Sequence, residues 1–421
     1  MAGSTHYSAP VYFGDRLIGV IDKIADQGRL RFTYEHSWRD TPGIWPLSLS
    51  LPMSQAVHTD ARREINRPIE HFLWGLLPDN NDTIAQWAGH FGVGRLDPLA
   101  ILCEIGADCP GAISFIEPVG RGSEEPVDTE AIARELRRLQ ESLPSRLAGD
   151  HGQFSLAGAQ AKTALRKTTH GWAIPRAGLP STHILKPAMT GLADQAVNEH
   201  FCLELARQMG LPAAQSEVAE FDGLPVLVIK RFDRYGGGRL HQEDFCQALG
   251  VRPRNKYQAD GGPGLSDMMQ LLDSHSGDPM DDQQRLYRAV LFNLMIAGTD
   301  AHSKNFALIY PPTAGQPRLA PLYDLNSMFP YAAQRRDMRS SLRIAGCYKL
   351  YDIQRRHLIR RITGARLGEQ RMAAQLDMML GKLPRAAATL ANEMADRGNR
   401  SDIPATIAQG ITHACARWRS T

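Results

Sequence analysis

Residues 298–310, GTDAHSKNFALIY, decide the fold of this chain of 421 residues. The residues before them, AVLFNLMI (289–296), are apolar on every side, which predicts the end of a buried and rigid helix. Gly298 should end that helix, and the letters FALIY should form a short strand after it. The loop between the two elements holds Asp300 and Asn305 and is therefore expected to be fixed at both ends.

The residue types in this loop suit phosphoryl transfer. An Asp can orient or deprotonate an attacking hydroxyl, while the amide oxygen of an Asn can hold Mg²⁺. The D-x-x-x-x-N spacing of Asp300 and Asn305 equals that of the protein-kinase catalytic loop. Asp324, in PLYDLNS, offers a second ligand, because Mg²⁺ prefers one or two carboxylates together with phosphate oxygens. Each residue alone is more often a turn or cap residue, so the interpretation depends on the order of further motifs.

Motifs earlier in the chain complete that order. FSLAGAQAKTAL (154–165) places small residues before Lys162, so that backbone N–H groups can approach phosphates; an ordinary hairpin turn is the alternative. Lys186, in the strand-like THILKP, can pair with phosphates or merely line a sheet edge. Glu199, on the next expected helix, is either the ion-pair partner of Lys186 or, as we favour, a solvated charge. The apolar VLVIKRFDR (226–234) can offer backbone groups to adenine.

Composition limits the class of protein. The 48 Lys and Arg against 45 Asp and Glu give a net charge of +3, which excludes a polybasic tail as the basis of function. Hydrophobic residues at 43% and charged residues at 22% exclude global disorder. The six Cys form no CxxC pair and no Cys/His cluster, so we expect a reducing compartment and no structural zinc. Without a signal-peptide pattern or an apolar stretch of about 20 residues, the sequence predicts a soluble cytoplasmic protein with no membrane partner.

The motifs follow the serial order of a bilobal kinase, and we expect an α+β, kinase-like fold. An α/β N-terminal part, beginning with a small β-rich subdomain, should precede an all-helical C-terminal domain. Antiparallel strands are expected over residues 10–34, and a short helix over 71–80 should be stopped by Pro78 and Asp79. A linker is expected over 119–128, followed by a charged helix. The expected boundaries are 1–119 for the N-terminal subdomain, 120–148 for linker and helix, 149–235 for a small-lobe-like subdomain with the phosphate loop, and 236–421 for the helical domain with the catalytic loop.

Eight motifs in this order resemble the HipA family, whose members are serine/threonine kinases and toxins of bacterial type II toxin–antitoxin modules. The resemblance covers nearly the whole chain and weakens after about residue 350. The motifs are SLAGAQAKTAL (155–165), HILKP (183–187), NEHFCLELARQMGL (198–211), VIKRFDR (228–234), QEDFCQALG (242–250), KYQADGGPG (256–264), GTDAHSKNFAL (298–308) and PLYD (321–324).

The resemblance implies a role for particular residues. Asp300 would be the catalytic base, with Asn305 and Asp324 as Mg²⁺ ligands, and Ser155 would be autophosphorylated. A dianionic phosphate just before the phosphate loop would pull that loop out and repel ATP. The implied nucleotide-binding residues are Ala157, Gly158, Ala159, Gln160, Ala161 and Lys162 in the phosphate loop, Lys186, the hinge residues Lys230, Arg231 and Phe232, then His302, Ser303, Lys304 and Asn305, and finally Tyr323 and Asp324.

The resemblance also implies ATP and Mg²⁺ as cofactors. The implied partners are a protein substrate and a dimeric helix-turn-helix antitoxin, through which the kinase would meet operator DNA indirectly. The substrate would be a translation component such as an aminoacyl-tRNA synthetase, whose phosphorylation would arrest growth. Two alternatives remain open, a small-molecule phosphotransferase of kinase-like layout and a catalytically silent corepressor bound to the antitoxin. A silent chain should have lost Asp300, Asn305 or Asp324, and all three are present.

Overall fold

The N-terminal part is built on a five-stranded antiparallel sheet in the order β4-β3-β2-β1-β5. The computed structural model describes residues 7–24, 28–118, 122–141, 155–158, 160–176, 178–189, 191–332, 335–360 and 362–419. The strands are β1 (Ser8–Phe13), β2 (Arg16–Ile24), β3 (Arg29–Tyr34), β4 (Val57–Thr59) and β5 (Ile113–Ser114). Side chains such as Val11, Ile21 and Phe32 are fully buried. The antiparallel strands predicted over residues 10–34 are therefore confirmed.

Helices lie between β3 and β5 in the sequence, and the segment that follows one of them, α2, carries Asp79. They are α1 (His36–Arg39), η1 (Glu64–Asn66), α2 (Pro68–Leu76), α3 (Asn81–Phe91) and α4 (Pro98–Ile105). Helix α2 begins on a proline, as helices often do. It ends before Leu77, which is extended because the residue before a proline avoids the helical conformation. Pro78 and Asp79 then lead the chain away from the helix end.

The central part is a six-stranded antiparallel sheet in the order β10-β11-β9-β7-β8-β6. Its strands are β6 (Ser123–Val127), β7 (Thr163–Thr168), β8 (Gly171–Arg176), β9 (His183–Pro187), β10 (Ser216–Phe221) and β11 (Leu224–Lys230), with helices α5 (Thr129–Gln140) and α6 (Gln195–Gln208). The predicted order strand, strand, helix, strand, strand is confirmed by β8, β9, α6, β10 and β11. The expected linker over 119–128 is corrected, because residues 123–127 pair with β8 as an edge strand.

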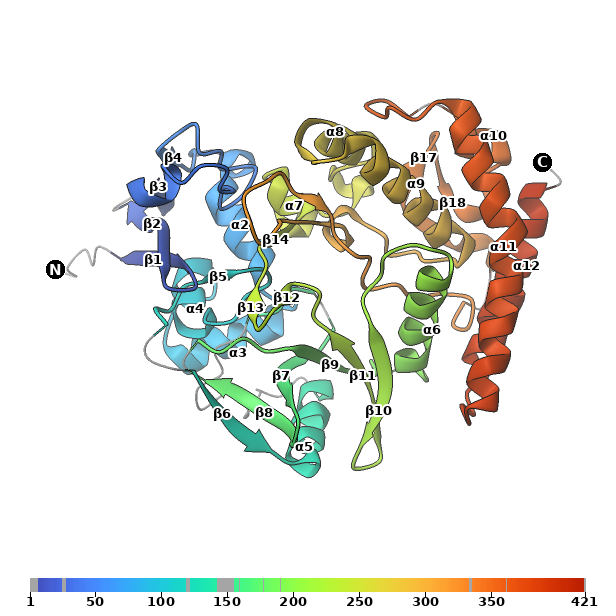
Figure 1. Cartoon of the computed structure of the whole chain (residues 1–421), viewed down its shortest axis with the longest axis horizontal. Coiled ribbons are helices and arrows are strands. Elements are labelled where there is room, and N and C mark those ends of the chain that lie inside the picture. Colours follow the sequence, from blue (N-terminus) through green and yellow to red (C-terminus); the bar gives the residue numbers. More distant parts are fainter. Residues whose placement is uncertain are drawn as a thin grey trace.

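Helix α5, which follows that edge strand, packs on the sheet through apolar side chains. Ile132 and Leu136 of α5 are fully buried against Leu165 and Leu185 of the sheet. Asp128 caps the helix by accepting a hydrogen bond from the backbone N–H of Ala131. The helix predicted after the linker is therefore part of the central layer, seen at the bottom of Figure 1.

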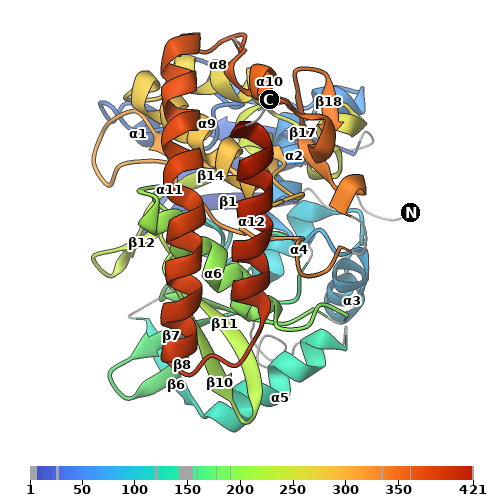
Figure 2. The ribbon, with the colours of Figure 1, turned by 90° about the vertical axis from the view of Figure 1, so that its right-hand side faces the viewer.

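The C-terminal part is mainly helical, as expected, but it is not all-helical. Its helices are α7 (Phe245–Ala248), η2 (Pro253–Asn255), η3 (Gln258–Asp260), α8 (Leu265–His275), α9 (Pro279–Met295), η4 (Ser303–Asn305), η5 (Arg335–Asp337), η6 (Leu350–Asp352), α10 (Arg355–Ile359), α11 (Glu369–Asp396) and α12 (Ile403–Arg419). Figure 2 shows α11 and α12 side by side along one face. Of the helices described, none is long and apolar enough to cross a membrane.

Short strands are the correction to the expected all-helical C-terminal domain. They are β12 (Arg234–Tyr235), β13 (Gly238–Arg239), β14 (Gln242–Asp244), β15 (Ala307–Ile309), β16 (Arg318–Leu319), β17 (Arg339–Ile344) and β18 (Cys347–Lys349). The strand β15, predicted from FALIY, pairs with β14 and β16 and buries Leu308 and Leu319. The two-residue strands β12, β13 and β16 are too short to show an alternation, so a sequence pattern does not reveal them.

One continuous hydrophobic core joins the N-terminal and C-terminal parts, from Ala9 to Trp418. At their contact the ring of Trp45 stacks on His241, with 4.4 Å between centroids and 13° between planes. The buried carboxylate of Glu243 accepts hydrogen bonds from Ser48 Oγ at 2.6 Å and from Tyr310 Oη at 2.5 Å. Burial raises the pKa of Glu243 to about 7. The N-terminal sheet is thereby anchored through specific polar contacts as well as apolar packing.

Candidate active site

A cavity of about 370 Å³ gathers most of the residues predicted from the sequence. Its wall comes from β9, the end of β11, the loop after α9 and the segment after β16. The predicted residues that line it are Ala157, Gly158, Gln160, Lys162, Lys186, Lys230, Arg231, Phe232, Asp300, His302, Lys304, Asn305, Tyr323 and Asp324. Three predicted residues, Ser155, Ala161 and Ser303, are outside this lining, and Ala159 lies outside the described residues.

The loop after α9 is shaped by its own backbone contacts. A Cβ on Gly298 would lie 2.5 Å from Asn293 Oδ1, so a larger residue would displace this side chain. Farther along, the side chain of Asn305 donates from Nδ2 to the carbonyl oxygen of Asp300 at 2.8 Å. This bond brings the two residues of the D-x-x-x-x-N motif together and leaves the amide oxygen of Asn305 available as a ligand.

Asp300 is held by an aromatic hydroxyl. Tyr257 Oη donates to Asp300 Oδ1 at 2.7 Å, and His302 Nε2 lies 3.7 Å from the same oxygen. Partial burial raises the pKa of Asp300, and the hydrogen bond from Tyr257 opposes that rise. Burial lowers the pKa of His302 to about 3, so its imidazole is neutral near pH 7. The carboxylate therefore has one oxygen fixed by Tyr257 and no charged imidazole beside it.

Lys186 sits between two carboxylates. Its Nζ lies 2.8 Å from Glu199 Oε1 and 3.2 Å from Asp324 Oδ1. Burial disfavours the ammonium form, but the two carboxylates hold the pKa of Lys186 above its ordinary value. Glu199 is only 1% exposed, so the solvated charge that the sequence favoured is wrong and the ion-pair alternative is right. Asp324 adopts a left-handed φ of 56°, a backbone conformation that few residues other than glycine adopt.

The phosphate-loop segment lies against the N-terminal part. Ser155 is fully buried, and its Oγ donates to the carbonyl oxygen of Leu76 at 2.6 Å. Gly158 has a φ of 103°, and its carbonyl oxygen accepts from the backbone N–H of Asp79 at 3.2 Å. Lys162 donates from Nζ to the carbonyl oxygen of Ala157 at 2.6 Å, which closes the loop on itself. Burial and the nearby ammonium of Lys186 lower the pKa of Lys162 to about 8.

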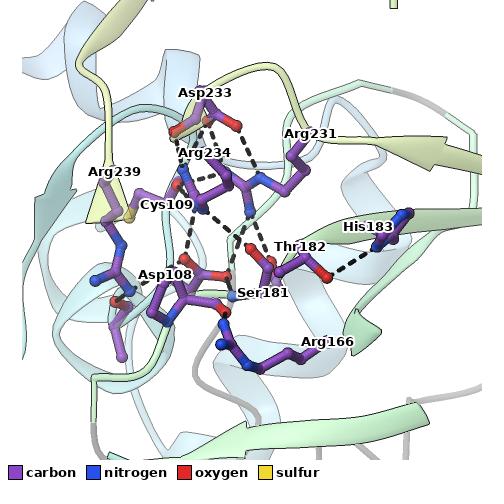
Figure 3. Close-up of polar contacts among 12 residues, drawn as sticks. Asp108, Cys109, Arg166, Ser181, Thr182, His183, Arg231, Asp233, Arg234 and Arg239 are labelled. Carbon is purple, nitrogen blue, oxygen red and sulfur yellow. Dashed lines mark hydrogen bonds and ion pairs between the residues drawn. The ribbon is translucent and has the colours of Figure 1, made fainter. Parts of the chain in front are cut away.

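The predicted hinge lines the cavity, but one of its side chains serves a buried ionic cluster. Figure 3 shows Arg231, Arg234 and Arg239 gathered around Asp108 and Asp233. Arg231 lies 2.8 Å from Asp233 and 3.3 Å from Asp108. Arg234 and Arg239 lie 2.7 Å and 3.2 Å from Asp108. The guanidinium of Arg231 is thus engaged inside the protein. The backbone N–H groups of Lys230 and Arg231 are also engaged, because they donate to the carbonyl oxygens of Gln215 and Thr182 at 2.8 and 3.0 Å.

Sequence reasoning missed three residues near the cavity. Asp79 was expected only to stop a helix, yet its carboxylate accepts from Lys304 at 2.9 Å and from Lys256 at 2.7 Å. Tyr257 and Lys256 lie in the motif KYQADGGPG, to which no role was given. The partners of Asp79 are 225 and 177 positions away in the sequence, so no local pattern could have linked them. Ser303, also predicted, is buried and donates from Oγ to the carbonyl oxygen of Lys256 at 3.1 Å.

The donor set of the cavity fits Mg²⁺ better than a transition metal. The described residues contain no group of three His, Cys, Asp or Glu that could hold a metal by itself. Mg²⁺ does not need such a group, because it takes one or two carboxylates with water and phosphate oxygens. Asn305 and Asp324 both line the cavity and offer an amide oxygen and a carboxylate. Lys186 and Lys162 lower the pKa of Asp324 against the effect of its burial, so this carboxylate is ionised.

Comparison with known proteins gives consistent matches over the chain. A family model described as HipA N-terminal domain matches residues 9–116, and one described as HipA-like C-terminal domain matches residues 154–397. The chain is 37% identical over 338 residues to the putative kinase Y4mE of Sinorhizobium fredii, covering 76% of this chain and 77% of that protein. It is 28% identical over 343 residues to the serine/threonine-protein kinase toxin HipA of Shewanella oneidensis, covering 76% and 75%.

A solved structure shows the same fold. In the complex of HipA, HipB and operator DNA from Shewanella oneidensis MR-1, one chain superposes with a TM-score of 0.80 at 23% identity. The match covers 98% of this chain and 97% of that one. The predicted α+β, bilobal kinase-like fold is therefore confirmed, with the short strands after residue 233 as its correction.

Proposed function

Because the chain belongs to the HipA family, we propose that it is an ATP-dependent serine/threonine-protein kinase and the toxin of a type II toxin–antitoxin module. The observation that carries this proposal is the convergence of Asp300, Asn305 and Asp324 with Lys186 on one cavity. In phosphoryl transfer, a protein contributes mainly by positioning the reactants and by balancing charge. These side chains are suited to both tasks.

In the proposed reaction, Asp300 orients the acceptor. Tyr257 occupies Oδ1 of Asp300, so Oδ2 is the oxygen that accepts a hydrogen bond from a Ser or Thr hydroxyl. As the hydroxyl oxygen bonds to the γ-phosphorus, its proton passes to Asp300, the bond to the β,γ-bridging oxygen breaks, and ADP leaves. Lys186 balances phosphate charge. Asn305 and Asp324 would hold Mg²⁺, which neutralises charge on the phosphate oxygens when bound.

The other predicted residues have matching places in this proposal. Lys230 to Phe232 and the apolar residues Ile184, Ile229 and Met328 line the cavity, as an adenine site requires. The phosphate loop, from Ala157 to Lys162, would face the triphosphate. A helix-turn-helix antitoxin dimer is the proposed partner, and operator DNA would be reached through it, in line with the solved complex of a relative with HipB and operator DNA.

Transfer of labelled γ-phosphate from ATP tests the proposed function. The purified chain should label Ser or Thr of a protein acceptor, a translation component such as an aminoacyl-tRNA synthetase being the first candidate. Labelling of small molecules only would favour the small-molecule phosphotransferase. Antitoxin binding without transfer to any acceptor would favour the silent corepressor, and either result would overturn the proposal.

Ser155→Ala is expected to remove most autophosphate from the purified chain, as measured by intact-mass spectrometry after incubation with ATP. Ser155 is fully buried, so a phosphate there requires the loop to leave its place beside Leu76. The variant loses one hydrogen bond, worth about 1 kcal/mol, and should remain folded. Ser114→Ala, which removes a comparable bond to the carbonyl oxygen of Ile116, should keep the autophosphate. Unchanged phosphate in the Ser155 variant would point to another site.

Lys186→Met is expected to weaken binding of an ATP analogue by at least about tenfold, measured by titration calorimetry. The substitution removes a cation from the cavity and leaves Glu199 buried without its partner. Lys167→Met is the matched control on the neighbouring strand β7. Its ion pair with Glu217 is about half exposed, and such pairs contribute little. Equal affinities of the Lys186 variant and the unmodified chain would contradict the assignment of this lysine.

A further inference from the structure

Asp79 belongs to the N-terminal part, yet it lies at the wall of the cavity. Its side chain is 14% exposed and accepts from two ammonium groups, Lys304 Nζ at 2.9 Å on Oδ1 and Lys256 Nζ at 2.7 Å on Oδ2. Burial disfavours the carboxylate, but Lys304 and Lys256 hold the pKa of Asp79 at about 2. Near neutral pH it is thus a charged group that both lysines share.

The backbone of the same residue contacts the phosphate-loop segment. The N–H of Asp79 donates to the carbonyl oxygen of Gly158 at 3.2 Å, and Pro78 forms a parallel bridge with Gly158. A few residues earlier, the carbonyl oxygen of Leu76 accepts from Ser155 Oγ. One short segment therefore touches the phosphate loop through its backbone and the loop after α9 through a carboxylate.

Asp79 is connected to the proposed reacting groups through its ion pair with Lys304. Lys304 lies between Asp300 and Asn305 in the chain, and its Nζ is almost fully buried. Its carbonyl oxygen accepts from Tyr323 Oη at 2.8 Å, next to Asp324. A shift of Lys304 would therefore displace both proposed metal ligands. Asn305 follows Lys304 in the chain, and Asp324 follows Tyr323.

We propose that Asp79 is a positioning residue for phosphoryl transfer, which sets the catalytic loop against the phosphate loop through Lys304. This inference rests on the proposed function and adds a residue from outside the kinase-like part of the chain. Misplacement by about 1 Å, even by a distant change, can cost about a hundredfold in rate. A group that fixes two loops at once is therefore expected to act on turnover.

The charge of Asp79 separates this role from a merely structural one. Asp79→Asn keeps the shape but leaves Lys304 and Lys256 without their shared negative charge. Ammonium groups that have lost this carboxylate attract a nearby polyanion more strongly, so affinity for ATP should stay the same or increase. Turnover should fall, because Lys304 is no longer held. General destabilisation would lower both quantities together.

The experiment compares kcat, the affinity for a non-hydrolysable ATP analogue and the melting temperature in a set of variants. Asp79→Asn should lower kcat at least about tenfold without weakening the analogue, and Asp79→Glu, which keeps the charge, should restore most of kcat. Lys304→Met should lower kcat to a similar degree, and the double variant should be no slower than the slower single one. Asp97→Asn is the matched control, since it neutralises the partly exposed Lys23 pair and keeps a residue suited to the helix cap.

Three results would overturn the inference. They are a kcat of Asp79→Asn within about twofold of the unmodified chain, a parallel loss of kcat and analogue affinity, and additive losses in the double variant with Lys304→Met. Absence of transfer by the unmodified chain is a different outcome. It would overturn the proposed function, whereas an active unmodified chain with an equally active Asp79→Asn variant overturns the positioning role alone.

Discussion

Asp300→Ala should lower the rate of phosphoryl transfer by about 10²- to 10⁴-fold and remove growth arrest in cells that express the chain. The carboxylate lines the cavity, and Tyr257 fixes one of its oxygens at 2.7 Å. Alanine removes the oxygen that would orient the acceptor hydroxyl. Because the side chain of Asp300 is 59% exposed, its loss should cost the fold little.

The measurement is initial-rate transfer of labelled γ-phosphate to a protein acceptor, with antitoxin binding as the check on folding. Asp15→Ala, in the exposed turn between β1 and β2, supplies a control with the same change of side chain far from the cavity. It should transfer phosphate at the normal rate. Persistent labelling by the Asp300 variant would show that another group orients the acceptor.

Asp108→Asn is expected to lower the free energy of unfolding by about 3–5 kcal/mol, the usual cost of leaving buried charges without a partner. Asp108 is 4% exposed and pairs with Arg231, Arg234 and Arg239, while Asp233 is the other carboxylate of the cluster. The amide keeps the shape of the side chain but removes its charge. Arg231 and Arg234 would then share Asp233, and Arg239 would lose its ion pair.

Urea denaturation measures this loss of free energy, and the same measurement at lower pH extends the test. Burial opposes ionisation of Asp108, but the three arginines hold its pKa well below the ordinary value. Its stabilising contribution is therefore present above about pH 4, near the unfolded pKa, and is lost as pH falls toward the lower folded value. The unmodified chain should lose stability over that range more steeply than the variant.

Asp273→Ala serves as the control for Asp108→Asn. Its ion pair with Arg366 is partly exposed, so the loss should stay below about 1 kcal/mol. If Asp108→Asn loses no more free energy of unfolding than the control, the ionic cluster around Asp108 does not stabilise the hinge. If the unmodified chain and the variant lose stability equally steeply as the pH falls, the lowered pKa of Asp108 is contradicted.

Local patterns were sufficient to predict much of the fold. The strands and the helix over residues 171–230 were predicted in their observed order, and the apolar end of α9 marks a buried helix. Lys186 was predicted from its place on a strand, and it does face the cavity. The bounds of the four expected segments and the role of each site residue stay predictions, and the variants described above test the roles.

What the sequence did not predict depends on distant partners. A lone acidic residue resembles a solvated charge or a helix cap until its partner is known, which is why Glu199 and Asp79 were misjudged. Arg231 likewise gave no sign that its side chain would turn to Asp108, 123 positions away. Strand β6 was hidden because its charged residues on a sheet edge resemble a linker.

The contact between Asp79 and Lys304 has a consequence for synthesis of the protein. On a ribosome that adds about 5–20 residues per second, the 225 positions between these residues take roughly 10–45 s to appear. Until then the cavity lacks the wall formed by the loop after α9. A nascent or prematurely terminated chain that lacks Asp324 therefore carries an incomplete site.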